Sequence, residues 1–322
     1  MKVAVTGGSG VVGSAVVRHL VAAGHDVAAL SRSREASEKL ESLGAVVVRG
    51  DVLDAEAVGR LLEGQARVFH VAGVNELCPR DPARMWEVNV EGTTTVAEQA
   101  ARKGVERMIL TSSAVTIGEE RGARGHESSL HRGHFLSEYE RSKTVGERLA
   151  IDLGGELEVV SVNPSSVQGP GRATGTGALL LAAARGKTRF LVDTTFSMVD
   201  IDDCARGHLL AAERGAHGER YILSGAVLTV RQVVRMIDSI LGRRRRAWFI
   251  QPWLVSALAP VVETAFRAIR RRPPLCRESA RVLLHGHSYD GRKATRDLGL
   301  EYTTVEDTLE STVRWFRDEG ML

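Results

Sequence analysis

The fold is decided near the N-terminus, where the chain reads Thr6-Gly7-Gly8-Ser9-Gly10-Val11-Val12-Gly13. This stretch follows a short apolar run at residues 3–6 and opens a helix-length stretch, so it predicts a strand, a tight turn and a helix start. Gly7 allows the turn, Gly10 lets the backbone approach a phosphate, and Gly13 allows close packing of the helix. Because free N–H groups at a helix start attract anions, we expect the turn to hold the diphosphate of a dinucleotide through Gly7, Gly10, Val11, Val12 and Gly13.

The first half of the chain continues this alternation of strands and helices. Helix-length stretches at 13–23, 35–43, 55–62 and 90–103 separate short apolar, β-branched runs at 3–6, 27–30, 46–48, 68–71, 108–111 and 159–162. Such an alternation predicts a parallel sheet with helices on both faces, which is the doubly wound α/β class of Rossmann type.

Beyond residue 164 the alternation loosens into a glycine-rich stretch at 169–177. We therefore expect a dinucleotide-binding domain formed by residues 1–164 and about 188–217, and a smaller mixed α/β substrate-binding domain formed by about 165–187 and 218–322. The segment 188–217 is placed with the first domain because a strand at 198–202 and a helix at 204–213 are expected to rejoin the main sheet.

Composition excludes several classes of protein. A chain of 322 residues with 43% hydrophobic and 26% charged residues is typical of a globular protein, and 43 Lys and Arg against 40 Asp and Glu are too balanced to predict nucleic-acid binding. The N-terminal residues do not resemble a targeting peptide, and no run reaches the length of a transmembrane helix. Three widely spaced cysteines without metal-ligand spacing, Cys78, Cys204 and Cys276, favour a reducing cytoplasm and predict no metal site.

The end of the second expected strand indicates which dinucleotide binds. An acidic residue there typically bonds the adenosine ribose of NAD, but this chain reads Leu30-Ser31-Arg32. A guanidinium pairs with a 2′-phosphate, so Ser31 and Arg32 favour NADP(H), with NAD(H) as the second possibility. The alternative is that Arg32 is a solvated loop charge.

Three residues have the pattern of a proton-transfer site. Tyr139 and Lys143 are four residues apart in a predicted helix and therefore share one face, where an ammonium lowers the pKa of a phenol. Ser113 ends a predicted strand and would hold a substrate oxygen. A surface Tyr/Lys pair is the alternative for this pattern alone, but its combination with Ser113 and the N-terminal glycine turn favours an enzyme.

Over nearly its whole length the chain resembles the extended short-chain dehydrogenase/reductases, within the NAD-dependent epimerase/dehydratase superfamily, and most closely their dihydroflavonol-reductase and hydroxysteroid-dehydrogenase branch. Besides the glycine turn and the Tyr/Lys pair, the resemblance rests on Gly50-Asp51-Val52, His70-Val71-Ala72-Gly73, Asn89-Val90-Glu91-Gly92-Thr93, Thr111-Ser112-Ser113 and the stretches 163–171, 199–208 and 293–299.

The resemblance implies roles for these residues. Tyr139 would donate a proton to a carbonyl oxygen, Ser113 would polarise it, and Lys143 would both tune the phenol and bind a ribose. Asn89 would be a relay or only a helix kink. Further cofactor contacts are implied for Asp51 and Val52 at the adenine, Ala72 and Gly73 at the ribose, and the segment from Pro164 to Val167 at the nicotinamide amide. The resemblance also implies a homodimer formed through two helices of the main domain.

Several reactions occur on this framework, and three features favour reduction. Ala114 stands where the resembled dehydratases carry an acidic pair, Arg32 replaces the acid of the resembled epimerases, and no stretch typical of sugar-diphosphate binding is found. We expect an NADP(H)-dependent oxidoreductase acting on a ketone or aldehyde, or the corresponding alcohol, of a lipophilic or polycyclic small molecule. The alternative is an NAD(P)-dependent nucleotide-sugar epimerase with tightly bound cofactor.

Two further stretches carry predictions about surroundings of the site. The apolar stretch 248–262 is expected to line the substrate pocket. Arginines at 243–246, 267 and 270–272 flank it, so one alternative is peripheral contact with a membrane. The other alternative is a buried helix, because Pro252 and Pro260 would interrupt a long surface helix. A polar loop contains His126, His131 and His134, which we expect to be solvated rather than metal ligands. The family resemblance implies that Glu127 or a histidine of this loop lies close to substrate.

Overall fold

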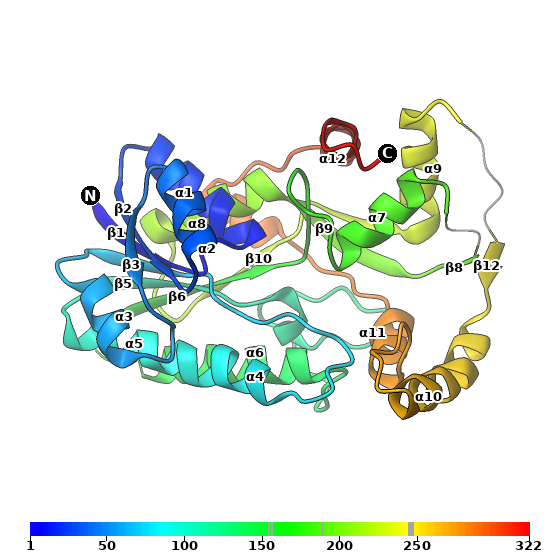
Figure 1. The fold of residues 1–322 in the computed structure, drawn as a ribbon, viewed down its shortest axis with the longest axis horizontal. Helices are drawn as coiled ribbons and strands as arrows, with labels where there is room; N and C mark the ends of the chain where they lie inside the picture. The colour runs from blue at the N-terminus through cyan, green and yellow to red at the C-terminus, as the bar shows by residue number, and fades with distance from the viewer. Residues whose placement is uncertain (154, 156, 188–189, 244–247) are drawn as a thin grey trace.

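A parallel sheet of seven strands lies at the centre of the molecule (Figure 1). The computed structural model describes residues 1–153, 155, 157–187, 190–243 and 248–322. The strand order is β10-β6-β5-β4-β1-β2-β3, and all neighbours are parallel. The strands are β1 (Lys2–Thr6), β2 (Asp26–Ser31), β3 (Val46–Arg49), β4 (Arg67–His70), β5 (Arg107–Thr111), β6 (Glu158–Pro164) and β10 (Arg220–Leu223). The predicted doubly wound α/β fold is confirmed.

Alternate residues of the strands supply two hydrophobic layers. In β1, Val3 and Val5 are buried with α1 and α8, whereas Ala4 is buried with α3 and α5 on the opposite face. Figure 1 shows the two sets of helices above and below the sheet. One set is α1 (Val11–Ala22), α2 (Arg34–Ser42) and α8 (Ile201–Arg214); the other is α3 (Ala55–Leu62), α5 (Gly92–Arg102) and α6 (Glu138–Asp152), with α4 (Ala83–Trp86), the π-helical η1 (Glu87–Glu91) and the 3-10 turn η2 (Ala114–Ile117) in the connections.

A smaller part of the molecule extends beyond the carboxyl ends of the strands (Figure 1). It contains a three-stranded sheet of β7 (Ser166–Gln168), β9 (Thr195–Asp200) and β11 (Ala226–Thr229), and a pair formed by β8 (Phe190–Val192) and β12 (Trp248–Ile250). Its helices are α7 (Thr176–Ala184), α9 (Val230–Ile240), α10 (Pro252–Ala268), α11 (Arg277–His285), α12 (Val305–Asp318) and the π-helical η3 (Ala294–Leu298). No helix of the described residues combines the length and apolarity needed to cross a bilayer.

The strand pairing does not follow the expected division at residues 188–217 and 218–322. As expected, α8 returns to the main sheet and packs on α1. However, β9 pairs with β7 and β11, whereas β10, expected in the substrate-binding part, pairs with β6. This pairing covers the edge of β6, whose N–H and C=O groups would otherwise lack partners.

The cysteines also differ from expectation. Cys78, in the loop after β4, and Cys276, the N-cap residue of α11, form a disulfide across 198 residues of sequence, while Cys204 is free and buried. Sequence spacing gives no indication of this pair, because the fold alone brings the two segments together. The disulfide ties the smaller part of the molecule to the edge of the main sheet.

Replacing both residues, Cys78→Ser and Cys276→Ser, is expected to lower the free energy of unfolding by about 2–4 kcal/mol, because the cross-link closes a long loop in the unfolded chain. Serine at position 276 keeps an N-cap oxygen, so the helix start itself is preserved. Urea unfolding of the variant and of oxidised and reduced wild type measures the effect. Equal stability of the oxidised and reduced wild-type protein would contradict the cross-link.

Candidate active site

The glycine-rich turn forms one wall of a cavity of about 310 Å³. The cavity lies where β1, β2 and β4 end, because the carboxyl ends of parallel strands meet at one edge of the sheet. Ten of the residues expected to contact a dinucleotide line it: Gly7, Gly10, Val11, Val12, Gly13, Arg32, Asp51, Val52, Ala72 and Gly73.

Two glycines make this cavity possible. Gly7 has φ +71°, and a Cβ atom there would lie 2.4 Å from the backbone nitrogen of Ala72. A Cβ atom at Gly13 would lie 2.1 Å from the carbonyl oxygen of Gly7. Backbone therefore forms the wall where side chains would block it, and these residues fit a diphosphate held at the start of α1.

Ser31 does not line this cavity, which corrects one prediction. Its side chain is buried, donates a hydrogen bond to the carbonyl oxygen of Ser33 at 3.1 Å and accepts one from Ser37 at 3.2 Å. The last residue of β2 thus faces α2, whereas Leu30 and Arg32 on either side of it line the cavity.

Arg32 meets a carboxylate at the cavity rim. Its Nη1 lies 3.4 Å from Oδ2 of Asp51, and Arg84 Nη2 lies 3.0 Å from the same oxygen. Burial raises the pKa of Asp51, but the backbone N–H of Leu53 and the two arginines outweigh it and hold that pKa below its ordinary value. Arg84 also pairs with Glu87 at 3.2 Å, so two guanidinium groups and two carboxylates balance each other at this rim.

The predicted catalytic residues meet in a second cavity of about 610 Å³. Ser113 follows β5 and precedes η2, while Tyr139 and Lys143 lie on α6, whose N-cap Ser137 accepts a hydrogen bond from the backbone of Glu140. Pro164 and Val167, expected at the nicotinamide, line the same cavity. Its remaining wall is largely apolar, with Val74, Leu77, Ala114, Val115, Leu179, Phe196, Val282 and Tyr289.

The surroundings keep the Tyr139 phenol protonated. Burial raises the pKa of Tyr139 above its ordinary value, and the two opposing influences are a hydrogen bond with Ser113 and the charge of Arg172. We expected Lys143 to lower the pKa of Tyr139. In the structure the groups that lower it are Ser113 and Arg172 instead, which corrects that expectation. The two hydroxyl groups that would face a substrate carbonyl are those of Ser113 and Tyr139.

Lys143 is held beside the sheet rather than in solvent. Its Nζ donates a hydrogen bond of 2.7 Å to the carbonyl oxygen of Thr111. Burial lowers the pKa of Lys143 to about 8, although the charge of Glu147 acts in the opposite direction. A small change in pH around 8 therefore converts the Lys143 ammonium into the neutral amine or back.

Asn89 lies in the π-helical turn η1 and joins the loop after β4 to α6. Its Oδ1 accepts a hydrogen bond from the backbone N–H of Val74 at 2.8 Å, and its Nδ2 donates to Ser142 Oγ at 3.0 Å. Asn89 therefore lies at an irregularity of the helix and also makes side-chain contacts with two neighbouring segments. Asn89 positions the segment that carries Tyr139 and Lys143.

Arg172 is a residue that sequence reasoning missed. It lines both cavities, its Nε is buried without a hydrogen-bond partner among the described residues, and its charge acts on Tyr139. The only signal was its position directly after the Gly169-Pro170-Gly171 stretch. A guanidinium that lines both cavities and makes no ion pair with any described residue is suited to contact cofactor or substrate.

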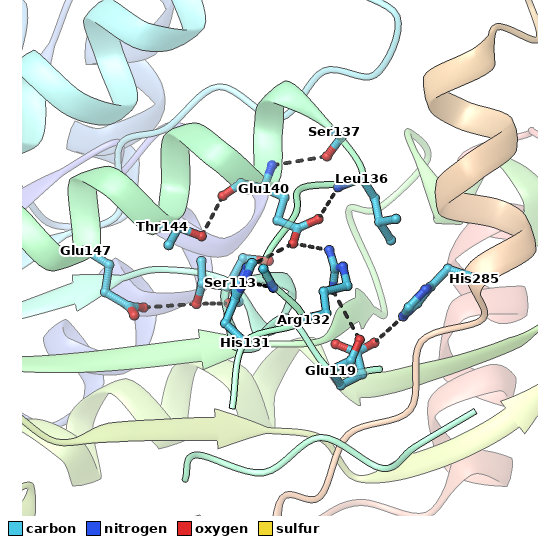
Figure 2. Close-up of polar contacts among 12 residues, drawn as sticks. Ser113, Glu119, His131, Arg132, Leu136, Ser137, Glu140, Thr144, Glu147 and His285 are labelled. Carbon is cyan, nitrogen blue, oxygen red and sulfur yellow. Dashed lines mark hydrogen bonds and ion pairs between the residues drawn. The ribbon is translucent and has the colours of Figure 1, made fainter. Parts of the chain in front are cut away.

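A buried polar network connects the start of α6 to the end of α11 (Figure 2). Glu140 pairs with Arg132, which donates to the backbone oxygen of Glu119 at 3.3 Å. The Glu119 carboxylate lies 2.7 Å from Nδ1 of His287 and 3.4 Å from Nε2 of His285. Burial alone would raise the pKa of Glu119, but its contacts with His285 and His287 lower it to about 2.

Glu119, His285 and His287 bring their ligand atoms close enough for a metal ion, which the spacing of the sequence did not predict. The Glu119 carboxylate already has His285 and His287 as partners, and Arg132 pairs with the Glu140 carboxylate beside it. We therefore interpret the group as a hydrogen-bonded network at the wall of the second cavity, which His287 lines. We call this cavity, which contains Ser113, Tyr139 and Lys143, the expected substrate cavity, or substrate cavity for short. The His-x-His pattern at 285–287 was its only signal.

The polar loop at 126–134 does not line the substrate cavity, contrary to expectation. Glu127 accepts a hydrogen bond of 2.9 Å from the backbone N–H of Ile222 and so stabilises β10. His131 lies 3.6 Å from Glu140, and His126 bonds Ser128 within the loop.

The apolar stretch 248–262 does not line the substrate cavity either. It forms β12 and the first part of α10, and only Val255 and Ala259 of α10 are buried. Pro252 begins this helix and Pro260 lies inside it, so neither residue interrupts it. Of the basic cluster before the stretch, Arg243 pairs with Asp238 at 3.0 Å, and residues 244–246 lie outside the described residues.

Comparisons with known proteins agree with this geometry. The model of the NAD dependent epimerase/dehydratase family matches residues 3–224. The chain is 31% identical to sterol demethylase protein B of Methylococcus capsulatus, over 100% of both chains, and 30% identical to a putative dihydroflavonol 4-reductase of Synechocystis, over 98% of this chain and 94% of the relative. The crystal structure of a nucleoside-diphosphate-sugar epimerase from Pseudomonas aeruginosa superposes with a TM-score of 0.81, at 27% identity over 100% and 99% of the chains.

Curated relatives of this chain also include ketoreductases and 3-beta-hydroxysteroid dehydrogenases. The parallel sheet, the glycine turn and the Ser/Tyr/Lys arrangement occur together in one chain that matches the family model over most of its sheet. The resemblance found in the sequence is thereby confirmed, and the protein is an NAD(P)-dependent enzyme of the dehydrogenase/reductase type. The chain belongs to the NAD-dependent epimerase/dehydratase family.

Proposed function

We propose that the enzyme is an NADP(H)-dependent reductase of a lipophilic or polycyclic ketone or aldehyde, which also oxidises the corresponding alcohol. The observation that carries this proposal is the second cavity, where a largely apolar wall surrounds Ser113 and a protonated Tyr139. Apolar walls with a few placed polar groups are typical of sites for small apolar ligands.

The chain's own residues account for proton transfer. The cofactor supplies the hydride to the carbonyl carbon. Ser113 donates a hydrogen bond to the substrate oxygen, and Tyr139 gives its proton to that oxygen. The raised pKa keeps this proton in place until the oxygen becomes basic, after which the Ser113 hydrogen bond and the Arg172 charge stabilise the phenolate. Lys143 would bind the nicotinamide ribose near the carbonyl oxygen of Thr111.

The direct test is NADPH oxidation followed at 340 nm over a panel of cyclic, steroidal and long-chain carbonyl compounds. We expect turnover of at least one apolar carbonyl, and a loss of about a thousandfold or more in Tyr139→Phe, because the proton donor is removed. Ser113→Ala is expected to lose about a hundredfold.

A second outcome of the same test identifies the alternative. A nucleotide-sugar epimerase would contain NAD that survives desalting, would interconvert a sugar nucleotide, and would not consume NADPH with any carbonyl compound. That result would contradict the reductase.

Among the described residues that line the substrate cavity, the basic side chains are Arg172 and Lys143, and Arg172 also lines the dinucleotide cavity. A sugar nucleotide, which carries a diphosphate, would therefore meet these two side chains.

NADP(H) is proposed over NAD(H) because Arg32 lines the dinucleotide cavity at the end of β2 with no acid on that strand end. We expect Arg32→Ala to weaken NADPH binding by tenfold or more and to leave NADH binding within about twofold, since only NADPH carries the 2′-phosphate. Calorimetric titration measures both. Arg34→Ala is the matched control, because Arg34 is exposed, pairs with Glu38 at 2.7 Å and does not line the cavity. Equal losses in both variants would show a general charge effect.

The pH dependence is expected to reflect Lys143. Its pKa of about 8 means that the ammonium, which would donate hydrogen bonds to the nicotinamide ribose, is lost above that pH, so kcat/KM for reduction is expected to fall about tenfold per pH unit there. The sign for stability is opposite: a lysine with a lowered pKa binds fewer protons when folded, so its effect on stability improves as pH rises from about 8 toward its ordinary value. Loss of activity without loss of thermal stability therefore distinguishes this titration from unfolding.

Removing the opposing charge should move this alkaline limb. Glu147 raises the pKa of Lys143, so Glu147→Gln is expected to shift the limb to lower pH. Because Glu147 also pairs with Arg220 at 2.8 Å, thermal unfolding is measured alongside. An unchanged limb in a folded variant would assign the titration to another group.

A homodimer through two helices of the main sheet stays a prediction, for which α5 and α6 lie side by side on one face (Figure 1). A cytoplasmic location also stays a prediction. Since disulfides are rare in that compartment, it implies that Cys78 and Cys276 are reduced in the cell.

A further inference from the structure

The helix α10 exposes apolar side chains where a surface helix normally exposes polar ones. Its inner face packs on α11, where Val255 and Ala259 contact Ala280 and Leu283 in a small hydrophobic cluster. On the outer side Trp253 is 66% exposed, Leu258 48% and Val261 65%. The hydrophobic surface of this helix is therefore larger than its packing on α11 requires.

The exposed apolar residues form one continuous face. At helical spacing this face contains Trp253, Ala257, Leu258, Val261, Ala265 and Ala268, all exposed. The hydroxyl of Thr264 is directed back to the helix, where it donates to the carbonyl oxygen of Pro260 at 2.8 Å. We call these six apolar residues the outer face of α10.

The charges of α10 lie beside this face and at its end. Its acid, Glu263, pairs with Arg267 at 2.9 Å and with Arg277 at 3.6 Å on the α11 side. Arg270 and Arg271, directly after the helix, are exposed and make no ion pair with any residue that the structure describes. An apolar face next to unpaired arginines is typical of helices that lie at an anionic membrane surface.

We propose that the outer face of α10 docks on the surface of an anionic lipid bilayer. The 17 residues of α10 measure about 25 Å along the axis, enough to lie in the plane of the interface. Trp253 at the start of the helix suits the headgroup region, which favours tryptophan. A second copy of this chain suits the face less well, because docking two copies there would bring their arginines together.

The position of α10 connects this surface to the substrate cavity. α10 packs on α11, and Val282 of α11 lines the cavity that contains Tyr139. If the substrate is lipophilic, which rests on the proposed function, docking places the cavity next to the phase in which such a substrate dissolves. The docking itself depends on the outer face and the arginines alone.

Co-sedimentation tests the proposal with two kinds of vesicle, pure phosphatidylcholine and phosphatidylcholine with about one third phosphatidylglycerol. We expect wild type to bind the anionic vesicles at low salt, and binding to weaken as salt rises. Arg270→Gln with Arg271→Gln is expected to weaken binding roughly twenty-fivefold, at about fivefold for each charge near the surface. Leu258→Glu with Val261→Glu is expected to abolish binding within the measurable range.

Matched controls separate this surface from general effects. Leu130→Glu introduces the same charge at another exposed leucine, and Arg314→Gln with Arg317→Gln removes two exposed arginines of α12; both variants should bind like wild type. No substrate or cofactor enters this assay, so its outcome is independent of the reductase activity.

Two results would overturn the proposal. One is wild type that stays in the supernatant with anionic vesicles at low salt. The other is a dimer in sedimentation velocity that dissociates in the Leu258→Glu, Val261→Glu variant while vesicle binding is absent, which would assign the face to a contact between two copies.

Discussion

The close approach of the glycine turn to the end of β4 is the constraint on which the site depends. A Cβ atom at Gly7 would collide with the backbone of Ala72, and one at Gly13 would collide with the carbonyl oxygen of Gly7. These contacts fix α1 against β1 and leave the helix start open toward the sheet edge. Since β1 pairs with β4, and β4 with β5, the same edge brings Ser113 into the neighbouring cavity. The two cavities are adjacent because β5, which leads to Ser113, and β1, which leads to the glycine turn, lie on either side of β4 in the sheet.

Local patterns were sufficient to predict the residues within this edge. The strands and helices of the first half, the glycine turn and the Ser/Tyr/Lys set were all visible because each depends on a few neighbouring residues. The prediction that Ser31 lines the dinucleotide cavity was wrong for a local reason too. A shift of one residue along a strand decides whether a side chain faces the cavity or a helix, and the sequence does not show which face is which.

Contacts between distant segments could not be predicted in this way. Cys78 and Cys276 meet across 198 residues, and Arg172 reaches both cavities from a loop without a side-chain pattern. The pKa of Tyr139 depends on Ser113 and Arg172, which the helix spacing of Tyr139 and Lys143 does not reveal. The apolar stretch 248–262 was wrongly expected to line the substrate pocket, because the sequence does not show how few of its residues α11 covers.

A carboxylate of the smaller part contacts the first residue of the helix that carries Tyr139, in addition to the buried network around Glu119. Glu278, in the first turn of α11, accepts hydrogen bonds from the backbone N–H of Cys78 at 2.6 Å and from that of Glu138 at 2.8 Å. Glu138 is the first residue of α6 and directly precedes Tyr139. Arg272 adds a hydrogen bond of 2.8 Å to the carbonyl oxygen of Leu77, a residue of the cavity wall. Because α10 packs on α11, these same contacts connect α10 to the loop after β4 and to the start of α6. The surface that we propose for docking and the residue that we propose as proton donor therefore belong to one connected unit of the fold.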